Sequence, residues 1–272
     1  MQPTFIISHR RSGTHLTIDT IRNNFPGFGE VPLLTDQKIL VDPIRLEGFE
    51  NLDRWQSAGR GIVKTHFLPE LTEYYPTDQS PEKGEEGKHP YYLPQFKAFL
   101  EKGKKIYVVR DGRDVMVSLY RYLQSFEASY QDIDFSDFLR TMNHFGPAST
   151  EKENRMEFWK NHVKQWLGRK DVLILKFEEL IINYEGAVEQ ISQYLGLKPL
   201  NPLVDVRLNK QSTFKRLSNR LFPDRQKRSI QRTQVQFHSA EIGVYRRFFT
   251  EKDLQLFEHH AGEALRLLNY DQ

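Results

Sequence analysis

Near its start the chain reads Thr4-Phe-Ile-Ile-Ser-His-Arg-Arg-Ser-Gly-Thr-His-Leu16, a short apolar run that passes through a basic turn of small residues into a helical pattern. A strand, a turn and a helix in this order can form an anion-binding loop, because backbone N–H groups and the helix dipole then face the ligand. Ser12, Gly13 and Thr14 would offer N–H groups and hydroxyls, and Arg11 would add positive charge. The segment predicts a phosphate site, with an ordinary surface turn as the alternative when it is taken alone.

Two later segments repeat the pattern of an apolar strand that ends in basic residues. Lys64 and His66 lie at the end of the first, residues 61–69, and Arg110 ends the strand in the second, residues 104–120. In α/β proteins, ligands bind at the carboxyl ends of parallel strands. We therefore expect three strand ends to meet on one anion.

Apolar, β-branched runs without alternation indicate buried parallel strands, which we expect near residues 4–8, 61–64, 105–110 and 172–177. Helical patterns separate them, and the expected helices span about 14–24, 91–101, 113–126, 154–167, 179–195 and 251–268. Strands that alternate with helices in this way predict a three-layer α/β fold with a central parallel sheet flanked by helices.

Composition narrows the class of protein. With 272 residues, of which 38% are hydrophobic, the chain can bury one large core, so we expect a single domain over residues 1–272. The absence of cysteine excludes disulfides and a thiol nucleophile. No apolar stretch is long enough to span a membrane, and the first strand follows Met1 without room for a signal peptide, so we expect a cytoplasmic protein without a membrane partner. A formal net charge of +3 does not suggest nucleic-acid binding.

In this order and spacing, the three segments resemble those of the PAPS-dependent sulfotransferases, cytosolic-type enzymes that act on small molecules. The corresponding family segments read approximately TYPKSGTTW, KTHLP and YVxRNxKDVxVSxY. Later family blocks match Glu157–Trp166, Val172–Leu180 and Ser212–Phe214, so the resemblance covers nearly the whole chain. It implies a P-loop-like fold, PAPS (3′-phosphoadenosine 5′-phosphosulfate) as donor, PAP as product, and no metal.

The resemblance also implies roles for individual residues. Arg11 takes the place of the family's loop lysine and, with Lys64, would stabilise the departing phosphate, while His66 would be the general base. Arg228 or Arg232 would replace two basic contacts of the family's 3′-phosphate site, and the basic segment 207–232 fits a lid. The full set of residues expected to bind the cofactor is Arg11, Ser12, Gly13, Thr14, His15, Arg110, Ser118, Phe177, Phe214, Arg228 and Arg232.

The acceptor pocket is expected to have aromatic walls, which suit a polar small molecule with a hydroxyl or an amine to be sulfated. Glu70 and Glu73 would favour a cationic acceptor such as a guanidinium alkaloid, in the secondary metabolism of a bacterium or cyanobacterium. The sequence leaves the oligomeric state open. The expected pocket residues are Phe67, Tyr74, Tyr91 and Tyr122.

Two other classes of protein stay open as alternatives. A nucleotide kinase-like phosphotransferase would share the fold and a phosphate loop, but the chain lacks a GxxxxGK[ST] motif. A non-catalytic PAP-binding protein would explain why His238 and Ser239 stand where the family has basic residues, whereas Lys64 and His66 argue for an enzyme.

Overall fold

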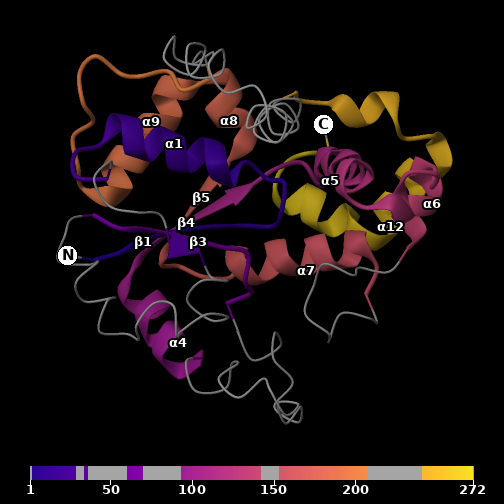
Figure 1. Ribbon diagram of the computed structural model, residues 1–272, viewed down its shortest axis with the longest axis horizontal. Coiled ribbons are helices and arrows are strands. Elements are labelled where there is room, and N and C mark those ends of the chain that lie inside the picture. Colours follow the sequence, from indigo (N-terminus) through magenta and orange to yellow (C-terminus); the bar gives the residue numbers. More distant parts are fainter. Residues whose placement is uncertain are drawn as a thin grey trace, which may run out of the picture.

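The described part of the molecule is organised around a parallel β-sheet (Figure 1). A computed structural model describes residues 2–28, 34–35, 60–69, 93–141, 153–207 and 241–271. The sheet has five strands in the order β2-β3-β1-β4-β5, and every pairing is parallel. The strands are β1 (Thr4–Ser8), β2 (Leu34–Thr35), β3 (Ile62–Thr65), β4 (Lys104–Val109) and β5 (Val172–Lys176).

Helices cover both faces of this sheet, because alternate apolar side chains of each buried strand point to opposite sides. Ile6 and Ile106 belong to the core on the side of α1 (Thr14–Asn24), α8 (Phe177–Ile182) and α9 (Tyr184–Leu195). Phe5 and Tyr107 belong to the core on the opposite side. That core also includes residues of α4 (Leu93–Lys102), α5 (Gly112–Phe126), α6 (Phe135–Arg140), α7 (Arg155–Leu167) and α12 (Glu251–Leu267). The predicted three-layer α/β fold is confirmed.

The largest difference from the sequence-based expectation lies in the predicted helix 179–195. The structure has two helices there, α8 and α9, which are separated at Asn183. The backbone of Asn183 leaves the helical region, with φ −128° and ψ 66°, and its side-chain oxygen accepts a hydrogen bond from Gly186 N. Asparagine is preferred at the N-cap of a helix over its interior, so a break at Asn183 is more stable than one continuous helix. The short strand β2, helix α6 and the 3₁₀ turns η2 (Ala128–Tyr130) and η4 (Val244–Arg247) were not predicted.

The sheet order determines where a ligand can bind. Strand β1 lies between β3 and β4, so the chain crosses to opposite sides of β1 as it builds the sheet. A crevice forms outside the carboxyl ends of parallel strands at such a switch point. The residues that follow β1, β3 and β4 are His9, His66 and Arg110, and all three therefore lie at this edge. Within the described ranges, no helix is both long and apolar enough to cross a membrane.

Candidate functional site

The loop after β1, residues 9–13, has the backbone geometry of an anion-binding loop. Arg11 and Gly13 adopt positive φ angles of 69° and 103°, and Ser12 N donates to His9 O at 3.3 Å. A Cβ atom at Gly13 would lie 2.4 Å from Cδ2 of Phe177, so both the φ angle and the close packing require glycine. Left-handed residues at alternate positions turn backbone N–H groups toward a common point.

Helix α1 begins directly after this loop with its amino end open to a ligand. Gly13 is its N-cap, makes no side-chain capping hydrogen bond, and is followed by no acidic residue in the first turn. The positive end of the helix dipole is therefore not neutralised locally. Ser12 Oγ is buried and has no hydrogen-bond partner within the part of the chain that the structure describes. A phosphate or sulfonate oxygen would satisfy this hydroxyl, so the loop fits an anionic group.

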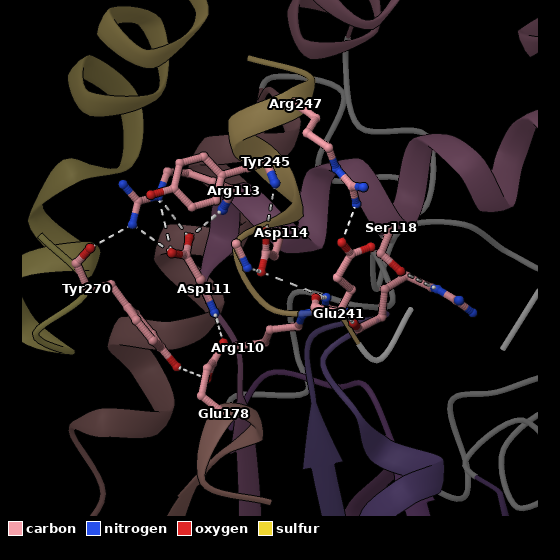
Figure 2. Close-up of polar contacts among 12 residues, drawn as sticks. Arg110, Asp111, Arg113, Asp114, Ser118, Glu178, Glu241, Tyr245, Arg247 and Tyr270 are labelled. Carbon is pink, nitrogen blue, oxygen red and sulfur yellow. Dashed lines mark hydrogen bonds and ion pairs between the residues drawn. The ribbon is translucent and has the colours of Figure 1, made fainter. Parts of the chain in front are cut away.

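Arg110 at the end of β4 joins this loop to a later part of the chain (Figure 2). Its side chain is 1% exposed. Its Nη1 donates to Arg11 O at 3.4 Å and its Nη2 donates to Glu241 O at 2.7 Å. Arg11 in turn donates from Nε to Ser118 Oγ on α5 at 3.2 Å. The structure thus brings together Arg11, Arg110 and Ser118, which the sequence analysis placed at one anion site.

Aromatic rings lie against both guanidinium groups. Cζ of Arg110 is 4.4 Å from the ring centroid of Phe177, and Cζ of Arg11 is 4.8 Å from that of Tyr122. Phe177 is 3% exposed and packs between Arg110 and Gly13. These contacts fix the orientation of the two cations and limit their access to water.

Asp114 is a buried residue of the site that the sequence analysis missed. Its carboxylate is fully buried and accepts hydrogen bonds from Gly243 N at 2.7 Å and Tyr245 N at 2.9 Å (Figure 2). The same carboxylate lies 3.9 Å from Nη2 of Arg110. Burial raises the pKa of Asp114, whereas the two N–H groups and the Arg110 charge act in the opposite direction. Asp114 therefore ties η4 to the arginine of the site.

A second polar network anchors the amino end of α5 and the carboxyl-terminal residues of the described chain. Arg113 forms an ion pair with Asp111 and donates to Tyr270 O at 2.6 Å (Figure 2). Glu178 accepts hydrogen bonds from Asp111 N and from the Tyr270 hydroxyl. Because Asp111 directly follows Arg110, this network also holds the end of β4 in place.

His66 follows β3 and is held in one tautomer. Its Nδ1 lies 2.8 Å from Ser8 O, and because a carbonyl oxygen only accepts, Nδ1 must carry the proton. The other ring nitrogen, Nε2, is then the basic one. Desolvation, followed by the charges of Lys64 and Arg10, holds the pKa of His66 well below 6.5, so the ring is neutral at physiological pH. A neutral imidazole with a basic Nε2 is suited to accept a proton.

Lys64 lies close to both His66 and the first turn of α1. Burial is the main cause that lowers the pKa of His15 to about 4, and the charges of Lys64 and Arg11 add to it. The Lys64 charge also lowers the pKa of His66. The positive charge of Lys64 therefore acts both on the first turn of α1 and on the histidine after β3.

The remaining predicted site residues fall into two groups. Phe67 is 8% exposed and lies beside His66, and Tyr122 contacts Arg11, so both are near the site. Residues 208–232 of the basic segment are outside the described ranges. The same is true of these predicted residues: Glu70, Glu73, Tyr74, Tyr91, Phe214, Arg228, Arg232, His238 and Ser239.

Comparison with protein families gives a match over almost the whole chain. A family model described as "Sulfotransferase domain" matches residues 2–269. Sulfotransferase 2B1 of Homo sapiens is 36% identical over 109 residues, which are 38% of this chain and 27% of that protein. The 3-beta-hydroxysteroid sulfotransferase of Cavia porcellus is 29% identical over 129 residues, 46% of this chain and 42% of that protein. The matched part thus spans less than half the length of these curated relatives.

Solved structures show the same fold. A mouse sulfotransferase in complex with PAP superposes with a TM-score of 0.58 at 18% identity, over 97% of this chain and 85% of that chain. A retinol dehydratase in complex with androsterone and PAP gives a TM-score of 0.50 at 18% identity, over 97% of this chain and 81% of that chain. At these identities the superpositions support the fold alone.

Proposed function

Because the chain belongs to the family of PAPS-dependent sulfotransferases, we propose that it transfers a sulfuryl group from PAPS to a hydroxyl or an amine of a small-molecule acceptor and releases PAP. The observation that carries this proposal is the convergence of three strand ends. The anion-binding loop follows β1, His66 follows β3 and Arg110 follows β4, all at the carboxyl edge of one parallel sheet. This convergence supports the proposal of an anion site beside a general base.

The donor would be held by the loop and by α5. Backbone N–H groups of the loop and the first turn of α1, with the hydroxyls of Ser12 and Thr14, would receive the 5′-phosphosulfate. The buried Ser12 Oγ, which has no hydrogen-bond partner among the described residues, supports this. Arg110 and Ser118 would form the second anion site, for the 3′-phosphate. PAPS supplies a sulfuryl group whose bond to the 5′-phosphate oxygen breaks as the bond from sulfur to the acceptor forms.

The proton and the negative charge of the reaction would be handled by separate residues. His66 would take the acceptor proton on Nε2, because Nδ1 is committed to Ser8 O. Lys64 and Arg11 would stabilise the charge that grows on the departing phosphate. The charges of Lys64 and Arg11 both act on His15, in the first turn of α1, which supports this role.

The finer parts of the hypothesis rest on sequence. A cationic acceptor such as a guanidinium alkaloid, a place in secondary metabolism, a cytoplasmic location and a single domain over residues 1–272 stay predictions. The lid role of the basic segment and the contribution of Arg228 or Arg232 stay predictions as well.

The donor class can be tested by calorimetric titration of the protein with PAP, AMP and ATP. We expect PAP to bind at least tenfold more tightly than AMP, because a charged hydrogen bond to the 3′-phosphate is worth about 1.5–3 kcal/mol. ATP, which lacks a 3′-phosphate, should resemble AMP rather than PAP. Equal affinities for PAP and AMP would contradict the assignment of the second anion site.

A further inference from the structure

Helix α7 presents two buried hydrogen-bond donors to the chain that follows β3. His162 Nε2 lies 3.1 Å from the carbonyl oxygen of His66, and Trp166 Nε1 donates to the carbonyl oxygen of Phe67 at 2.9 Å. His162 and Trp166 are four residues apart, so they lie on one face of the helix, and both side chains are fully buried. Two successive carbonyl groups are therefore held by two successive turns of one helix.

The His66 carbonyl and a tyrosine of β4 together account for the proton position on His162. The carbonyl oxygen of His66 can only accept, so His162 carries its proton on Nε2, and Nδ1 accepts from the Tyr107 hydroxyl at 2.9 Å. The Tyr107 ring stacks against His162 and Trp166, with centroid distances of 5.5 and 5.9 Å. Burial, followed by the nearby His9, lowers the pKa of His162 to about 3, which keeps the ring neutral.

The histidine after β3 is thus restrained on two sides. Ser8 O holds Nδ1 of its ring at 2.8 Å, and α7 holds the carbonyl of its backbone. We propose that His162 and Trp166 are positioning residues that fix the place of the His66 imidazole, and that Tyr107 supports the required tautomer of His162 by donating to its Nδ1. This inference rests on the proposed function, because it assigns these residues to the same reaction.

The reason to expect an effect on chemistry is geometric. A general base acts only within hydrogen-bond reach of the proton that it removes, and a shift of about 1 Å at a reacting group can cost about 10²-fold in rate. Ser8 O alone leaves the ring free to move with its own backbone. The two bonds from α7 remove that freedom, and the rings of His162 and His9, whose centroids are 5.7 Å apart, are also in contact.

The test compares variants that keep or remove one N–H donor. His162→Gln places an amide N–H near the position of Nε2, whereas His162→Leu removes the donor at similar size. We expect kcat to fall about tenfold or more in H162L and to be largely restored in H162Q, with PAP affinity within a few-fold of wild type in both. Equal kcat in H162L and wild type, or an H162Q variant no better than H162L, would overturn the proposal.

Trp166→Phe and Trp159→Phe form a matched pair on the same helix. Trp159 is also fully buried, but it packs against Phe257 on α12. Both substitutions remove an indole, so a general loss of packing should affect both variants alike. We expect kcat to fall about tenfold in W166F and to stay within about twofold of wild type in W159F. Equal losses in the two variants would mean that Trp166 contributes to packing and does not position His66.

Two measurements keep the inference testable if the larger changes unfold the protein or if the reaction is not found. Tyr107→Phe removes one hydroxyl and leaves the stacked ring, and we expect a several-fold fall in kcat; an unchanged value would exclude the role of Tyr107.

Imidazole ¹⁵N spectra of the wild-type protein require no turnover and should show the Nε2–H tautomer for His162 and the Nδ1–H tautomer for His66. The opposite tautomers would overturn the arrangement. Absence of sulfuryl transfer in wild type would instead contradict the proposed function.

Discussion

His66→Ala is expected to lower the rate of sulfuryl transfer by about 10²–10⁴-fold while leaving PAP affinity within a few-fold of wild type. The two effects separate because His66 follows β3, whereas the donor would be held by the loop after β1 and by Arg110 and Ser118. The substitution keeps the backbone carbonyl that His162 contacts, so the chain after β3 retains its support. Turnover of labelled PAPS and calorimetry with PAP measure the two quantities.

His260→Ala is a suitable control for this experiment. His260 lies on α12, pairs with Glu157 on α7 and has no role in the proposed reaction. It should leave turnover within about twofold of wild type. Near-parental turnover in H66A would make His66 a structural residue and would move the general base elsewhere.

Arg110→Ala is expected to weaken PAP binding by about 10- to 150-fold, which corresponds to the loss of a charged hydrogen bond worth about 1.5–3 kcal/mol. AMP affinity should change only a few-fold, because AMP lacks the 3′-phosphate that Arg110 would contact. The guanidinium is almost fully buried beside Asp114, so its removal also leaves a buried carboxylate with less compensation and should lower thermal stability. Calorimetry with both nucleotides, below the unfolding temperature of the variant, gives the ratio.

Arg113→Ala provides the matched control. Arg113 lies three residues further along the chain and binds Asp111 and Tyr270 O, not the loop after β1. We expect R113A to lower stability while the ratio of PAP to AMP affinity stays close to that of wild type. If R110A weakened PAP and AMP equally, Arg110 would be a structural residue and the 3′-phosphate site would have to lie elsewhere.

The sequence predicted those features that depend on local pattern. The strand 4–8 and the helix 14–24 have the predicted bounds, because an uninterrupted apolar run, a glycine turn and a helical repeat are all local signals. The break at Asn183 was missed because asparagine inside an apolar repeat also fits a continuous helix. The capping hydrogen bond to Gly186 N decides between the two.

The contacts that complete the site depend on residues far apart in the sequence. Asp114 accepts from Gly243 N, 129 positions away, and His162 contacts His66 O, 96 positions away. Neither partner is a side chain, so no pairing of residue types could reveal them. A partial signal existed for Asp114, because it lies only four residues after Arg110, in the first turn of the helix that follows this strand end. His162 lay in a block that matched the sulfotransferase family, but its hydrogen-bond partners became apparent only in the structure.

The most direct test of sulfuryl transfer is an assay with ³⁵S-labelled PAPS and a pool of hydroxyl and amine metabolites, in buffer with excess EDTA. We expect label to move to at least one metabolite with one PAP released for each sulfuryl group transferred, at a rate that the chelator does not change and that His66→Ala lowers by about 10²–10⁴-fold. The labelled product would also identify the acceptor. Binding of PAP without any transfer to the pool would favour a non-catalytic PAP-binding protein, and transfer of phosphate from ATP that requires Mg²⁺ would contradict the proposal in favour of a nucleotide kinase.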